Sequence, residues 1–178
     1  MEVVKNRETA AAFEELAMPL FDQLYNFARW LTRDPAEAED LVQETYVKAL
    51  RGFSSFQLGT NFRAWIYRIL HNTFLTSRTG LKATHTVALD LEEAVEVPSG
   101  QATPEAILID RSQQETLQAA LDEIPAPYRE ILLLCEVEEM SYKEIAEVLA
   151  IPIGTVMSRL SRARSALRGS LKEKMAKV

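Results

Sequence analysis

Apolar residues recur at spacings of three and four along most of this chain, which is the period of a helix that buries one face. The first apolar stripe lies between Phe13 and Leu31. Pro19 within it marks a helix start or a kink, because proline has no backbone N–H to donate. No segment alternates apolar and polar residues as a half-buried strand would, so the pattern predicts an all-α protein.

Start signals and breaks divide the rest of the N-terminal half. Asp34 and Pro35 supply an N-cap and a proline at the first helical position, which predicts a helix over 35–50. Serines and a glycine collect at 53–61, where we expect a loop with buried aromatic residues. A second apolar stripe then predicts a helix over 61–78.

The helical period is lost over 81–102, where carboxylates and a Pro-Ser-Gly sequence predict a mostly extended, acidic, flexible linker. This linker separates an N-terminal domain at 1–80 from a C-terminal domain at 103–178. The second domain is expected to hold four helices, at 103–124, 127–137, 141–148 and 154–174. A short helix, a tight turn and a final helix rich in Arg and Ser form the pattern of a helix-turn-helix, which places its last helix in the major groove of DNA.

The distribution of charge along the chain favours DNA binding, although the net charge does not. A net charge of −6 argues against a nucleic-acid partner, because phosphates must be met by Lys and Arg. Between Glu44 and Asp90, however, there is no acidic residue, and 153–178 holds seven basic residues against Glu173 alone. Two cationic segments therefore lie in an acidic protein.

Composition excludes several other classes. Cys135 is the single cysteine, so no disulfide can form within the chain. Together with the two histidines of the chain, it supplies too few ligands for a zinc site. No apolar run reaches the ~18 residues that a membrane span needs, and no signal peptide is present. We expect a cytoplasmic protein without a cofactor. An enzyme is the least favoured class, because no nucleophile with its base and no phosphate loop is present.

The final predicted helix has two different sides. Its inward side carries Val156, Leu160, Ala163 and Leu167. Its opposite side carries Ser158, Ser161, Arg162 and Ser165, with Arg159 and Arg164 at the edges. Small serines allow a close approach to the groove while Arg reaches base edges or phosphates. The alternative is a solvated basic helix end, which the helix dipole would favour.

Two surfaces of the N-terminal half also suggest binding. Aromatic residues alternate with Arg over 51–78, a combination typical of single-stranded DNA binding, although about half of the rings would only pack in the core. Asn72 and the loop at 56–61 are the better candidates for reading an extruded base. On the helix at 35–50, carboxylates lie next to Leu41 and Val42, which suits a basic protein partner or a solvated face.

Four motifs then resemble extracytoplasmic-function (ECF) sigma factors of bacterial RNA polymerase, within the sigma-70 superfamily. The motifs are DLVQET from Asp40, NFRAWIYRI from Asn61 with Asn72-Thr73, SYKEIA from Ser141 and GTVMSRL from Gly154. The resemblance covers roughly residues 10–80 and 105–170, in the order of the family's second and fourth conserved regions.

The resemblance implies a transcription initiation factor that carries core RNA polymerase to promoters. Docking on the clamp helices of the largest polymerase subunit would use Asp40, Leu41, Gln43 and Glu44. Capture of the melted −10 strand would use Phe56, Asn61, Arg63, Trp65, Tyr67, Arg68 and Asn72. Duplex −35 recognition would use Thr155, Met157, Ser158, Arg159, Ser161 and Arg162. The linker would run toward the RNA exit path, and an anti-sigma protein often controls such factors.

Other interpretations remain open on the residues alone. Many relatives carry Arg where this chain has Met157, so their −35 sequences cannot be transferred. A regulator of the response-regulator output type also ends in a helix-turn-helix, but it leaves the aromatic segment at 53–78 unexplained. A helical adaptor that binds no DNA would leave both cationic segments as solvated surface. In a sigma factor, polymerase docking could gate DNA recognition, because an acidic chain should bind DNA poorly when free.

Overall fold

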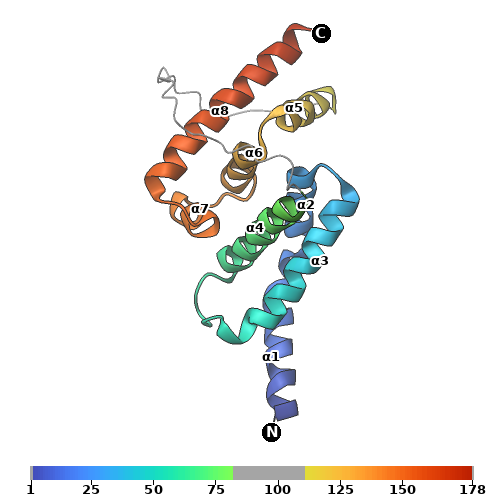
Figure 1. Cartoon of the computed structure of the whole chain (residues 1–178), viewed down its shortest axis with the longest axis vertical. Coiled ribbons are helices and arrows are strands. Elements are labelled where there is room, and N and C mark those ends of the chain that lie inside the picture. Colours follow the sequence, from blue (N-terminus) through green and yellow to red (C-terminus); the bar gives the residue numbers. More distant parts are fainter. Residues whose placement is uncertain (1, 82–110, 178) are drawn as a thin grey trace. The chain divides into compact units, whose positions relative to one another are not determined.

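The computed structural model describes residues 2–81 and 111–177, and all their regular elements are helical, which confirms the all-α prediction (Figure 1). The N-terminal elements are α1 (Glu2–Ala17), the 3-10 turn η1 (Met18–Leu20), α2 (Phe21–Thr32), α3 (Pro35–Gly52), the 3-10 turn η2 (Phe53–Ser55) and α4 (Phe62–Leu81). The C-terminal elements are α5 (Arg111–Glu123), α6 (Ala126–Leu132), the π-helical turn η3 (Leu133–Val137), α7 (Tyr142–Leu149) and α8 (Ile153–Ala176).

The linker is predicted at 81–102, but Leu81 still belongs to α4. Residues 82–102 and the helix start predicted at Thr103 lie outside the described residues. Helices α1–α4 belong to one compact unit, and α5, α6, η3 and α8 belong to a second. Within the described parts of the chain, no helix has the length and apolar character needed to cross a membrane.

The first unit is built around α3, which packs against α2 on one side and α4 on another. The apolar stripes found in the sequence form its core. Its fully buried side chains include Leu24, Leu31, Val42, Ile66 and Leu70. Pro19 lies in η1, so the helical stripe breaks there, as the sequence predicts. Tyr46 of α3 secures this break, because its hydroxyl donates a hydrogen bond to the Ala17 carbonyl at 2.6 Å.

The start of α3 follows the predicted capping pattern. The Asp34 Oδ1 atom accepts hydrogen bonds from the backbone N–H groups of Ala36 at 2.8 Å and Glu37 at 3.0 Å. These are two of the donors that a helix start leaves without an intrahelical partner. Arg33 before it adopts a left-handed conformation with φ 64°, which ends α2 and turns the chain into α3. The cap therefore fixes where α3 begins.

The second unit packs α5 and α6 against α8. Its core is formed by Ala120, Leu121, Ile124, Ile131, Leu134, Val156, Leu160 and Ala163. The helix predicted at 127–137 is present, but its last turn, η3, is π-helical. The Glu138 N–H donates to the Leu133 carbonyl at 2.9 Å, five residues back. One extra residue in the turn is a feature that apolar spacing does not reveal.

The helix-turn-helix pattern is also present along the chain. Helix α7 ends at Leu149, and Ala150 has a left-handed φ of 53°. The Ile151 N–H closes the turn by donating to the Ala146 carbonyl at 3.1 Å. Pro152, in an extended conformation, then precedes α8. The residues that punctuate the sequence therefore form the tight turn before the last helix.

Candidate functional site

The outward face of α3 carries the acidic residues predicted to meet a protein partner. Asp40, Gln43 and Glu44 are exposed, with Asp40 and Glu44 one helical turn apart. Leu41 is only 5% exposed, so it packs beneath this face and offers a partner almost no surface. Val47 and Leu50 are 46% and 49% exposed and extend the same face with apolar surface. Sequence reasoning missed these two residues, although they lie four and seven positions after Gln43.

A cleft of about 370 Å³ borders this face between α3 and the C-terminal half of α4. Glu37, Asp40 and Glu44 line its α3 side. Arg33 and Arg78 also line it, and Arg78 lies over the Phe74 ring with its guanidinium carbon 4.9 Å from the ring centroid. The cleft therefore combines three carboxylates with two guanidinium groups.

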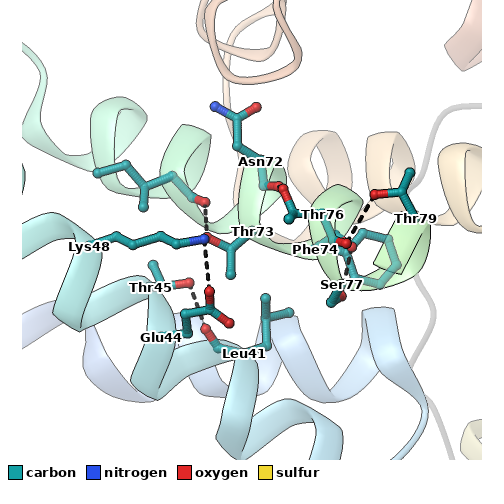
Figure 2. A network of polar contacts seen from close by, with 11 residues as sticks. Leu41, Glu44, Thr45, Lys48, Asn72, Thr73, Phe74, Thr76, Ser77 and Thr79 are labelled. Carbon is teal, nitrogen blue, oxygen red and sulfur yellow. Dashed lines mark hydrogen bonds and ion pairs between the residues drawn. The ribbon is translucent and has the colours of Figure 1, made fainter. Parts of the chain in front are cut away.

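Lys48 connects the acidic face of α3 to α4. Figure 2 shows its ammonium group between Glu44, at 2.9 Å from Oε1, and Thr73, at 3.4 Å from Oγ1. The Thr73 hydroxyl donates onward to the Ile69 carbonyl at 2.7 Å, so it accepts from Lys48 and donates within its own helix. Thr73 directly precedes Phe74 and follows Asn72, which is exposed. A polar chain thus links a predicted docking residue to the helix predicted to bind DNA.

The aromatic residues of α4 and the loop before it are divided between core and surface. Phe53, Phe62 and Tyr67 are buried, whereas Phe56 and Trp65 are half-buried and lie 5.0 Å apart between ring centroids. Tyr67 is 1% exposed and packs edge-on against Phe27 of α2 at 5.3 Å. The Tyr67 ring therefore cannot stack on a base in this conformation. Phe56 and Trp65 remain available for stacking.

The polar candidates near these rings have different settings. Asn61 is exposed, and its Oδ1 accepts a hydrogen bond from the Ala64 N–H at 3.0 Å, so it also caps α4. Arg68 and Asn72 are exposed on α4, and Arg63 is half-buried over the Tyr67 ring at 5.6 Å from its centroid. Arg68 and Asn72 therefore place hydrogen-bond donors on the exposed side of α4.

The loop before α4 is an ordered turn with an apolar tip. Thr60 donates hydrogen bonds to the Gln57 carbonyl from its N–H, at 3.2 Å, and from its hydroxyl, at 2.7 Å. Gly59 has φ 89°, a conformation that side chains with a Cβ rarely adopt. Leu58 is 67% exposed. The turn therefore holds an apolar side chain in solvent beside Phe56.

The predicted two sides of α8 are present. Val156, Leu160 and Ala163 are buried, and Leu167 is half-buried. Of the predicted −35 residues, Met157 and Ser158 are exposed, and the others are half-exposed: Thr155, Arg159, Ser161 and Arg162. Gly154 at the helix start has open space around it, which allows a close approach of the backbone to a partner.

Arg164, at the edge of this surface, forms an ion pair with Glu136. Its guanidinium donates to Glu136 Oε1 from Nη2 at 2.7 Å and from Nε at 3.0 Å. These hydrogen bonds raise the pKa of Arg164 above its ordinary value. Nη2 also lies 3.7 Å from Cys135 Sγ, and burial raises the pKa of the Cys135 thiol. Glu136 lies 28 residues before Arg164, so the sequence pattern gave no sign of this pair.

Comparison with known proteins matches each half of the chain to a known family. Residues 16–84 match the family described as Sigma-70 region 2, and 114–167 match Sigma-70, region 4. ECF RNA polymerase sigma factor SigE of Mycolicibacterium smegmatis is 37% identical over 162 residues, which are 90% of this chain and 62% of SigE. The chain therefore spans less than two thirds of SigE. ECF RNA polymerase sigma factor SigW of Bacillus subtilis is 31% identical over 91% of this chain and 90% of SigW.

Solved structures agree with this assignment. The sigma factor RpoE, solved in complex with the anti-sigma factor NepR from Bartonella quintana, superimposes with a TM-score of 0.70 at 30% identity, covering 90% of this chain and 97% of RpoE. CnrH, in complex with the cytosolic domain of CnrY, shares the fold with a TM-score of 0.63 at 23% identity, covering 96% of each chain. The two matched regions, in the order that the motifs indicate, and the similarity to SigW along nearly its whole length show that the chain belongs to the ECF sigma factors of the sigma-70 family.

Proposed function

We propose that the chain docks on core RNA polymerase through the outward face of α3. Asp40 and Glu44 present two exposed carboxylates one turn apart, and Gln43 lies between them. Val47 and Leu50 add exposed apolar area at the C-terminal end of this face. A surface with this order fits a partner segment that has a basic part and an apolar part, because opposite charges steer association and apolar contact adds affinity. Leu41 supports the face from beneath.

The −10 element is captured as a single strand by α4 and the loop before it. Phe56 and Trp65 offer half-buried rings for stacking, at roughly 1–3 kcal/mol per base. Arg68 and Asn72 are exposed on α4, where Arg meets phosphates and the Asn amide meets the edge of an extruded base. Asn61 and Arg63 lie between these two aromatic residues in the sequence. Tyr67 contributes to this site by packing beneath it.

The −35 element is read as duplex DNA by the outward side of α8. Ser158 and Met157 are exposed there, and Arg159 and Arg162 are half-exposed. An Arg that meets guanine through two hydrogen bonds contributes about 1–3 kcal/mol of discrimination between base pairs. Because two weak DNA contacts belong to one chain, each raises the effective concentration of the other.

An anti-sigma protein is the regulator that we expect for this chain. The support is the RpoE relative, which was solved in complex with an anti-sigma factor and resembles this chain over nine tenths of its length. A free chain of net charge −6 should bind promoter DNA weakly, so polymerase docking gates recognition. Tight, specific binding of promoter duplex by the free chain would contradict this gating.

The observation that carries the proposal is the presence of an exposed acidic face on α3 and exposed Arg and Ser side chains on α8 within one sigma-family chain. The test combines the chain with core polymerase on promoter DNA and maps unpaired thymines with permanganate. We expect reactive thymines in the −10 element only when the chain and the core polymerase are both present. A stable complex that leaves the duplex closed at every promoter would overturn the −10 assignment.

A further inference from the structure

Helix α8 extends beyond the part of the chain that matches the family. The region 4 match ends at residue 167, whereas α8 continues to Ala176. Residues 168–176 therefore form a helical extension of the DNA-reading helix, and we call it the α8 extension. It contains Arg168, Lys172 and Lys174, and Lys177 follows it at the helix C-cap.

The α8 extension is fixed against α5. Glu123, the last residue of α5, accepts hydrogen bonds from the Ser170 hydroxyl at 2.6 Å and from the Lys174 ammonium group at 2.5 Å. The hydrogen bond from Lys174 lowers the pKa of the Glu123 carboxyl below its ordinary value. Leu171, between the two donors, is half-buried. The extension thus has a defined orientation about its own axis, with Ser170 and Lys174 turned toward α5.

This orientation leaves Arg168 and Lys172 on the outward side, and both are exposed. Seven residues make almost two full helical turns, so Lys172 follows Ser158 and Ser165 along one line of the helix. Arg168 follows Ser161 in the same way. The two cations therefore continue the side of α8 that is proposed to face the −35 element.

Two other cations of α8 are paired with carboxylates of the second unit. Arg164 is paired with Glu136, and Lys174 is paired with Glu123. No ion pair among the described residues involves Arg168 or Lys172. The only acidic residue of α8, Glu173, lies about 100° around the helix from Lys172. Arg168 and Lys172 thus remain available on the side of α8 that is proposed to face DNA.

Resting on the proposed function, we propose that Arg168 and Lys172 bind backbone phosphates at the border of the −35 element. Helix α8 rises about 1.5 Å per residue, so Lys172 lies about 21 Å along the axis from Ser158. The major groove is only about 12 Å wide. Side chains so far along the helix reach the phosphates at the edge of the groove, beyond the base edges that the N-terminal part reads. These contacts strengthen binding to every −35 sequence equally.

The test measures how salt weakens the binding of promoter DNA by the complete holoenzyme. For each phosphate that the protein neutralises, the logarithm of the binding constant falls by about 0.9 when the salt concentration rises tenfold. The variant Arg168→Ala/Lys172→Ala should therefore have a slope about 1.8 smaller than the unchanged chain. Its defect should be about tenfold larger at 50 mM than at 200 mM salt. The ratio of affinities for two different −35 sequences should stay the same.

A matched control separates a phosphate contact from a general loss of charge. Lys172→Ala and Lys177→Ala remove the same group five residues apart, but Lys177 acts electrostatically on Glu123 on the side of α8 turned toward α5. We expect a smaller salt slope for Lys172→Ala and an unchanged slope for Lys177→Ala. Equal slopes for these two variants would overturn the phosphate contact, as would a changed preference among −35 sequences.

Two further measurements distinguish this inference from the proposed function. If the double variant binds core polymerase more weakly in the absence of DNA, Arg168 and Lys172 contact the polymerase and the inference is wrong. If the unchanged chain directs initiation and the double variant has the same salt slope, the inference alone fails. If the unchanged chain directs no initiation at any promoter, the proposed function fails.

Discussion

The docking face of α3 gives the sharpest prediction about polymerase binding. The double variant Asp40→Asn/Glu44→Gln removes both exposed carboxylates while keeping the size of each side chain. Its cost to the fold should be small. Glu44 forms a solvent-exposed pair with Lys48 within α3, at 2.9 Å, and such a pair contributes about 0.3–0.5 kcal/mol. Such a loss changes the ratio of folded to unfolded protein by only about twofold.

The expected cost to polymerase binding is larger. A hydrogen bond to a charged group contributes about 1.5–3 kcal/mol, and about 1.4 kcal/mol corresponds to a tenfold change in affinity. Even one lost contact should therefore weaken the complex with core polymerase at least tenfold. Because the folded state still dominates, unfolding cannot produce a loss of this size.

The assay titrates fluorescently labelled chain with core polymerase and records thermal unfolding of the same samples. The control variant Glu14→Gln/Glu15→Gln removes two exposed carboxylates from α1 and leaves α3 unchanged. We expect the control to bind like the unchanged chain. Unchanged affinity of the docking variant, or an equal loss in the control, would refute the assignment of this face.

Three further predictions concern the first unit. Asp34→Ala should lower the free energy of unfolding by about 0.5–2 kcal/mol in urea, because two backbone N–H groups lose their cap. Tyr67→Ala should cost about 3–5 kcal/mol because its ring is buried, whereas Phe56→Ala should reduce permanganate reactivity at the −10 element with a smaller loss of stability. Lys48→Met should raise the affinity for core polymerase about twofold in the same titration, because it removes a positive charge beside Glu44. Weaker binding would show that the contact between Lys48 and Thr73 shapes the docking face.

Features that depend on neighbouring residues could be predicted from the sequence. The Asp34 cap and the break at Pro19 need only a few adjacent residues, and the structure contains both. The inward side of α8 follows from spacing alone, and Val156 and Leu160 are buried as predicted. Such features are decided within one or two helical turns, which is the range over which spacing carries information.

Features that depend on distant residues could not be predicted in this way. A motif indicates that Leu41 and Tyr67 matter, but it does not indicate which side of a helix faces the core. Tyr67 is buried because Phe27 of α2 packs against it, 40 positions earlier. Arg164, at the edge of the surface predicted to face DNA, is paired with Glu136. Both outcomes depend on how helices pack together, which the local pattern leaves open.

Run-off transcription with purified core polymerase tests the sigma-factor assignment most directly. The template should be a library of promoters that differ in their −35 and −10 elements, transcribed with and without the purified chain. We predict discrete transcripts from a subset of promoters that appear only when the chain is added. Promoter-independent transcripts that are the same with and without the chain would contradict the proposed role in initiation.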